Sequence, residues 1–156
     1  MQTTLIERSI VLLLCLLFLS CTGGREDNEK QLDRETRIEL RQMMTVGKQL
    51  YLQYCANCHL EDGSGFKGLY PPLKNADYMQ EDLARTVCII KNGQKGSIIV
   101  NGEEYNQQMP NNLNLTNLEI AEIATFIYNR FADSTIVVSA REVDTILLEC
   151  DLPVVY

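Results

Sequence analysis

The segment Cys55-Ala56-Asn57-Cys58-His59 decides how this chain is interpreted, because it brings two thiols and an imidazole together within five residues. His59 is the only histidine among the 156 residues. On a helical turn, thiols at this spacing lie on one side, with the imidazole next to them. The pattern occurs in covalent haem attachment sites, and its C-x-x-C part also in zinc sites and redox dithiols.

The neighbouring sequence separates these three kinds of site. A zinc site needs a fourth ligand, usually from a second Cys or His pair, whereas Cys88 and Cys150 each stand alone. A redox dithiol normally follows a strand, but residues 46–54 have helical character. Apart from a chance pentapeptide, haem attachment remains. We therefore expect one covalent haem c, bonded to Cys55 and Cys58, with His59 as an iron ligand.

The N-terminal residues indicate export. An apolar run from Ile10 to Leu19 is too short to span a bilayer, which takes about 20 residues, and it has the length of a signal-peptide core. Ser20-Cys21 ends the run and resembles a bacterial lipobox. We expect a signal peptide at residues 1–20, lipidation of Cys21 and anchoring to a membrane in the bacterial periplasm. Simple cleavage and secretion is the alternative.

Composition narrows the class of protein further. The chain is 46% hydrophobic and 22% charged, as in ordinary globular proteins, and its length suits one domain with extensions. Its net charge of −7 has the wrong sign for binding a phosphate backbone, so we expect no nucleic-acid partner. Residues 21–45 show only weak helical patterning and are interpreted as a solvated tether or linker.

With its attachment motif, the chain resembles class I cytochromes c over residues 46–131. Gly47 and Tyr51 precede Cys55 at the family's spacing, and residues 118–131 resemble its C-terminal helix, with Phe126 in the place of the usual aromatic. Thr116 and Glu119 form a capping box at the start of that helix. The resemblance implies an all-α cytochrome c fold wrapped around the haem, with the N-terminal helix crossing the C-terminal one.

The resemblance also implies two further residues of the haem site. Four methionines of the exported chain could supply a sixth iron ligand: Met43, Met44, Met79 and Met109. The family places this ligand in a Met-Pro step, which selects Met109, and Pro110 stiffens the loop that holds it. The family's Pro-x-Leu step implies that the Pro71 carbonyl accepts the His59 N–H. A core role for Met109 and a simple turn at Pro71 remain the alternatives.

Several segments add to the minimal fold. Residues 81–91 are expected to be helical, and 98–100 with 103–105 to form a β-hairpin insertion. Tyr105 and Asn106 of this insertion are candidates for the distal pocket, although ordinary hairpin packing is the favoured interpretation of both residues. Residues 132–156 are a C-terminal extension expected to dock on the haem domain, with a strand at 135–138 and a capped helix from Ser139. Cys88 and Cys150 form a candidate disulfide, and two separate buried thiols are the alternative.

Together these features predict an exported, membrane-anchored electron carrier rather than an enzyme, with a redox donor and a redox acceptor as partners. No catalytic residues are proposed. One alternative is a haem subunit or docking module of a larger oxidoreductase complex, suggested by the C-terminal extension. The other is a haem sensor or a peroxidase-like protein in which the Met109 ligand is labile.

Overall fold

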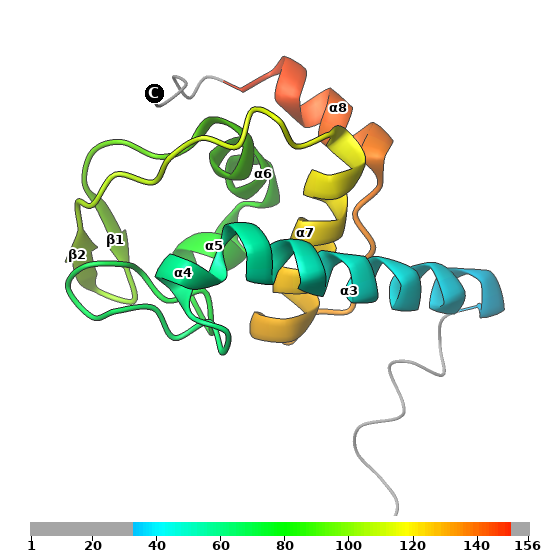
Figure 1. Cartoon of the computed structure of the whole chain (residues 1–156), viewed down its shortest axis with the longest axis horizontal. Coiled ribbons are helices and arrows are strands. Elements are labelled where there is room, and N and C mark those ends of the chain that lie inside the picture. The colour runs from blue at the N-terminus through cyan, green and yellow to red at the C-terminus, as the bar shows by residue number, and fades with distance from the viewer. Residues whose placement is uncertain (1–32, 151–156) are drawn as a thin grey trace, which may run out of the picture. The chain divides into compact units, whose positions relative to one another are not determined.

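The computed structural model describes residues 33–150 and is mainly helical (Figure 1). The expected signal peptide and Cys21 lie outside these residues. No helix between residues 33 and 150 has the length and apolar character needed to cross a membrane. In chain order the elements are α3 (Arg34–Tyr54), α4 (Ala56–His59), α5 (Asp77–Glu81), α6 (Leu83–Asn92), β1 (Ile98–Val100), β2 (Glu103–Tyr105), α7 (Asn117–Phe131) and α8 (Ala140–Leu148).

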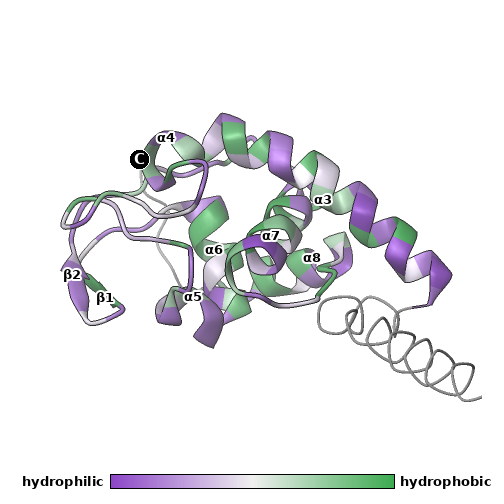
Figure 2. Cartoon of the chain, turned by 90° about the horizontal axis from the view of Figure 1, so that it is seen from below, coloured by the Kyte–Doolittle hydropathy of each residue, from purple (hydrophilic) through white to green (hydrophobic). Residues whose placement is uncertain are grey.

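Helix α3 begins well before residue 46, where the haem domain was expected to start. Asp33 caps it, because its carboxylate accepts hydrogen bonds from the backbone N–H groups of Glu35 and Thr36. The first turns of α3 extend past the other helices and are mostly hydrophilic (Figure 2). Part of the expected tether, from Arg34 onward, is therefore helical. Its apolar periodicity is weak because this end of α3 contacts little of the core.

Helices α3 and α7 cross in close contact, as the family resemblance implied. A β-carbon on Gly47 would lie 2.1 Å from the carbonyl oxygen of Glu122, so only glycine permits this approach. One turn later, the ring of Tyr51 lies 5.4 Å from the rings of both Phe126 and Phe131. Tyr51 is fully buried, and this aromatic cluster fixes the two helices around one core.

The expected helix at residues 81–91 is divided at Asp82. Asp82 has an extended backbone, separates α5 from α6 and caps α6 by accepting the Arg85 N–H. The hairpin is present where it was expected, with Ile98 opposite Tyr105. Its turn, Asn101-Gly102, has positive φ at both residues, which suits a tight two-residue hairpin.

Residues 132–150 of the C-terminal extension pack on the helical core without the strand expected at residues 135–138. The Val138 N–H donates to Thr125 Oγ1, and the Ile136 N–H donates to Asn129 Oδ1, so the segment is held by side chains of α7. Together with the bond that the Asn129 amide donates to the Ile136 carbonyl, these bonds satisfy backbone groups of Ile136 and Val138 without a partner strand. Helix α8 follows, capped by Ser139, and contacts both α7 and α6.

A disulfide joins Cys88 on α6 to Cys150 just after α8. The Cα atoms of the two residues are 5.8 Å apart, within the usual range for a bridge. The two residues are separated by 62 positions, and in the chain-entropy model a loop of that size adds about 4 kcal/mol of stability. The bridge therefore ties the extension to the core covalently.

Candidate functional site

The attachment motif lies where two helices meet. Cys55 ends α3, donating its N–H to the Tyr51 carbonyl at 2.9 Å, and it is also the residue before α4. Helix α4 is a single turn that carries Cys58 and His59. Leu60 ends it with a positive φ of 61°, and its carbonyl accepts the Tyr51 hydroxyl at 2.5 Å. The helix that packs tightly against α7 thus leads directly into the attachment motif.

His59 is 8% exposed and has a defined orientation. Its Nδ1 lies 2.9 Å from the Pro71 carbonyl oxygen. Because a carbonyl only accepts, Nδ1 carries the hydrogen and Nε2 keeps a free lone pair. Burial lowers the pKa of His59, and the hydrogen bond to Pro71 opposes this shift. The imidazole is therefore neutral at neutral pH and ready to act as a metal ligand.

The turn that presents the Pro71 carbonyl depends on Gly65. Gly65 has a φ of +61°, and a β-carbon there would lie 2.5 Å from the Tyr70 oxygen and 2.6 Å from the Pro71 oxygen. The chain folds back tightly at this point, and the Gly65 N–H donates to the His59 carbonyl at 3.0 Å. The Gly- and Pro-rich loop thus serves to orient the imidazole.

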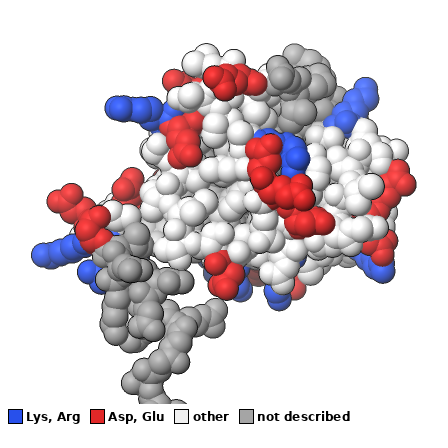
Figure 3. Space-filling model, turned by 180° about the vertical axis from the view of Figure 1, so that it is seen from behind, with Lys and Arg blue, Asp and Glu red and all other residues white. Residues whose placement is uncertain are grey.

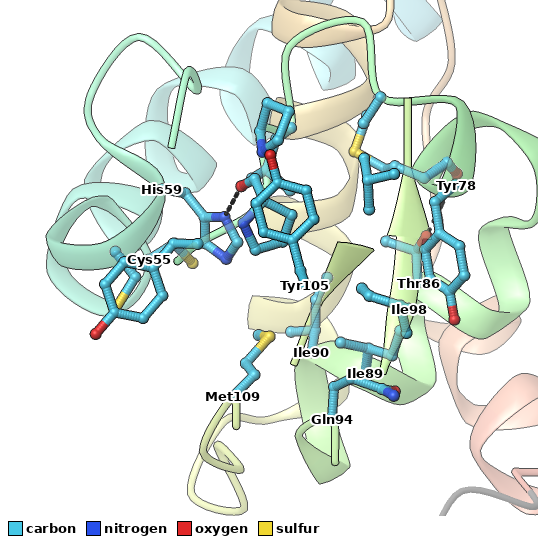
Figure 4. A pocket seen from close by; sticks show the side chains of 18 of the residues that line it. Cys55, His59, Tyr78, Thr86, Ile89, Ile90, Gln94, Ile98, Tyr105 and Met109 are labelled. Carbon is cyan, nitrogen blue, oxygen red and sulfur yellow. Dashed lines mark hydrogen bonds between the residues drawn. The ribbon is translucent and has the colours of Figure 1, made fainter. Parts of the chain in front are cut away.

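A cavity opens beside His59, and about 1000 Å³ of space lies within it and its open mouth. Cys55 and His59 lie at one side and Met109 faces His59 across the space (Figure 4). The remaining walls are mainly apolar and come from α6, the hairpin and α7; they include Ile89, Ile90, Ile98, Val100, Ile123 and Ile127. These walls suit a large, flat, apolar ligand.

Met109 enters the cavity from the loop before α7. Its backbone exchanges two hydrogen bonds with Gln94: the Gln94 N–H donates to the Met109 oxygen at 3.0 Å, and the Met109 N–H donates to the Gln94 oxygen at 2.9 Å. Met79 also lines the cavity, whereas Met43 is buried on α3, outside it. Met44 packs against the core without lining the cavity.

Some cavity residues were missed in the sequence. Tyr78, Thr86 and Gln94 all line it, on the side away from Cys55 (Figure 4). Gln94 directly follows the helix-ending Asn92-Gly93, and that boundary was the available signal. Tyr105 lines the cavity as expected for a pocket residue, but Asn106 does not.

The geometry also disfavours the two other uses of a C-x-x-C motif, as a redox dithiol and as a zinc site. Helix α3, not a strand, precedes Cys55, which is unlike the thioredoxin arrangement. Burial raises the pKa of the Cys55 thiol to about 12, opposite to what a reactive dithiol needs. Within residues 33–150, no three His, Cys, Asp or Glu side chains form a group that could hold a metal ion. The described part of the chain therefore does not assemble a zinc site around this motif.

The residues present fit a covalently attached porphyrin. Cys55 and Cys58 are free of any disulfide at the cavity wall, and beside them His59 offers one neutral nitrogen. Two thiols for thioether bonds, an imidazole for iron and apolar walls for the ring define a protein of the c-type cytochrome class.

Comparison with known proteins agrees with this class. The family model described as Cytochrome c matches residues 44–130. Two proteins from Thermus thermophilus, both named cytochrome c-552, are each 33% identical over 94 residues, or 56% of this chain. The alignment covers 70% of one relative and 62% of the other. This chain belongs to the cytochrome c family, as a class I member whose cofactor is covalently bound haem c.

Proposed function

We propose that this protein passes single electrons between redox partners, with His59 and Met109 as the two axial ligands of its haem iron. The observation that carries the proposal is that these two side chains face each other across one apolar cavity. His59 offers Nε2 because Pro71 holds its Nδ1–H, and Met109 offers a thioether sulfur from the opposite wall. Ligands on both faces suit electron transfer rather than the binding of small molecules.

Each residue of the site has a part in this function. When bound, haem supplies an iron that exchanges one electron between its ferrous and ferric states. Cys55 and Cys58 hold the porphyrin, and the Pro71 carbonyl makes the His59 imidazole a more basic ligand. Met109 contributes a neutral sulfur, which favours the ferrous state and raises the reduction potential relative to two imidazoles. The apolar walls exclude water.

An optical spectrum of the purified protein, oxidised and reduced, tests this proposal. We expect a pyridine haemochrome typical of two thioether bonds and a weak long-wavelength ferric band that reports sulfur on iron. Colourless protein from a host able to mature c-type cytochromes would contradict haem attachment. A haemochrome without the long-wavelength band would contradict the Met109 ligand and would favour a sensor or peroxidase-like protein.

We also infer that the protein is exported and anchored to a membrane through Cys21. Support comes from the apolar run Ile10–Leu19 and from the lipobox-like Ser20-Cys21 that ends it. Mass spectrometry of the mature N-terminus should find lipidated Cys21. Cys21→Ala should release the protein from membranes, whereas the neighbouring Thr22→Ala should not; equal membrane retention of both variants would contradict the anchor.

The acidic surface of this protein suggests that its redox partners carry positive charge where they dock. The chain has 14 basic and 21 acidic residues, and carboxylate side chains form several clusters on the face shown in Figure 3. We propose that the electron donor and acceptor dock through basic patches, because complementary charge speeds encounter. Electron-transfer rates with a basic partner should therefore fall as ionic strength rises. Rates that rise with salt would contradict this assignment.

A further inference from the structure

We propose that Cys88 and Cys150 are positioning residues: their disulfide holds α6 where it keeps Met109 facing His59. This inference rests on the proposed His59 and Met109 ligation. It assigns the bridge a role in the haem site, although neither cysteine lines the cavity.

First, the end of α6 holds the loop that carries Met109. Besides the paired bonds between Gln94 and Met109, the Asn112 N–H donates to the Lys91 carbonyl at 3.0 Å. The Asn112 amide donates to the Ile90 carbonyl at 3.0 Å. The Lys91 ammonium donates to the carbonyls of Leu113 at 2.9 Å and Leu115 at 2.7 Å. The loop from 109 to 115 is therefore bonded repeatedly to the last turn of α6 and the residues just after it.

Second, the loop and α6 are too close to shift independently. A β-carbon on Gly93 would lie 2.5 Å from the Met109 carbonyl oxygen and 2.9 Å from the Asn111 nitrogen. Gly93 has a φ of +81°, so it bends the chain at the helix end directly into this contact. A displacement of α6 must therefore move the Met109 backbone as well.

Third, the bridge is anchored on α6 itself. Cys88 lies one turn before Asn92, on the buried side of the helix with Val87. Helix α6 has only 10 residues and depends on packing rather than on its own helical stability. Cys150 follows α8, which contacts both α6 and α7. The bridge thus closes a covalent ring that contains Met109, its loop and the whole of α7.

The consequence is a shift in the population of protein with Met109 bound. Without the bridge, α6 gains freedom, and the state in which the thioether has left the iron becomes more populated. An added ligand such as imidazole binds only that state, so its apparent affinity rises with the population. A bridge that only adds global stability would leave this affinity unchanged in the folded protein.

The main experiment compares imidazole binding to ferric holoprotein in three forms: wild type, C88A/C150A and Met43→Ala. Met43 is buried on α3, outside the cavity, so Met43→Ala weakens the fold away from α6 and controls for lost stability. We expect the apparent imidazole affinity to rise about tenfold in C88A/C150A and to stay near wild type in Met43→Ala. Equal affinities in all three forms, or equal rises in both variants, would overturn the inference.

A second measurement needs no substitution, in case C88A/C150A fails to accumulate. Wild-type holoprotein is reduced with ascorbate, which leaves disulfides intact, or with ascorbate plus a phosphine until a thiol count shows the bridge open. Carbon monoxide should bind faster to the second sample, because it too competes with Met109. Identical binding rates would overturn the inference.

The experiments distinguish a failure of the proposed function from a failure of this inference. If wild-type protein lacks the haemochrome or the long-wavelength ferric band, the haem or its Met109 ligand is wrong, and the inference falls with it. If wild type shows both and its ligand binding is independent of the bridge, only the positioning role of Cys88 and Cys150 is lost.

Discussion

A β-carbon placed on Gly47 would lie 2.1 Å from the carbonyl oxygen of Glu122, nearer than any two such atoms can stay. The backbones of α3 and α7 therefore touch at this point. The contact also places Tyr51 against Phe126 and leads into Cys55, so it positions the attachment motif.

Gly47→Ala should separate these helices. We expect the free energy of unfolding to fall by about 3 kcal/mol, because the obstructing atoms are backbone and cannot rotate away. Denaturant unfolding followed by circular dichroism would measure the loss. Lys48→Ala, at the exposed neighbouring position, is the control and should change stability by less than about 0.5 kcal/mol. Equal effects of the two substitutions would show that the close approach is unimportant.

Met109→Leu should remove the sixth ligand and preserve the covalent haem. Leucine has a similar volume but no sulfur, so the ferric long-wavelength band should vanish and carbon monoxide affinity should rise at least about tenfold. The reduction potential should fall, because the neutral sulfur favours the ferrous state. Met79→Leu is the matched control, since Met79 lines the same cavity and should keep the band. Loss of the band in Met79→Leu instead would reassign the ligand.

Gly65→Ala should disturb the hydrogen bond between Pro71 and His59. The added β-carbon would clash with the Pro71 carbonyl at 2.6 Å, and a weaker bond makes the imidazole a less basic ligand. A less basic ligand stabilises ferric iron less, so the reduction potential should rise. Voltammetry of the holoprotein would measure it.

Gly68→Ala is the control for Gly65→Ala. Gly68 also has a positive φ, of +76°, but a β-carbon there meets nothing within 4 Å. This variant carries similar backbone strain without touching Pro71, so its potential should match wild type. A similar rise in both variants would mean that strain in the loop, rather than the hydrogen bond, sets the potential.

Tyr51→Phe should destabilise the protein at neutral pH and reduce its sensitivity to alkali. Losing the hydrogen bond to the Leu60 carbonyl should cost about 1 kcal/mol. Burial raises the pKa of Tyr51 above its ordinary value of 10.0. Above pH 10 the unfolded chain therefore releases a proton that the folded chain keeps, and wild-type stability falls as pH rises.

The pH dependence of unfolding checks this prediction for Tyr51. The free energy of unfolding of Tyr51→Phe should decline less steeply above pH 10 than that of wild type. Some decline should remain, because burial also raises the pKa of Tyr128. Parallel curves for the two proteins would show that Tyr51 does not contribute.

The sequence predicted those elements whose signals are local. The capping box of Thr116 and Glu119 and the apolar stripe after it located α7, and Asn101-Gly102 located the hairpin. The start of α3 was missed because its first turns contact little of the core and so lack apolar periodicity. Its only strong signal was Asp33, which caps the helix.

Other features depend on tertiary contacts that a sequence does not display. Residues 135–138 have strand-like composition, but side chains of α7 rather than a partner strand accept hydrogen bonds from the N–H groups of Ile136 and Val138. In the candidate site, the attachment motif and the Met-Pro step were visible as local patterns. The pair of hydrogen bonds between Gln94 and Met109 could not be predicted in this way. These bonds join backbone atoms of two loops, so they do not depend on side-chain type.

The raised pKa of Cys55 links the chemistry of this thiol to the folding of the chain around it. At neutral pH the folded apoprotein keeps this thiol almost entirely protonated, since burial raises its pKa to about 12. A newly made, still extended chain has an ordinary thiol pKa and far more of the nucleophilic thiolate. The state of this thiol therefore depends on folding: once Cys55 is buried where α3 meets α4, the protonated form is favoured more strongly than in the extended chain.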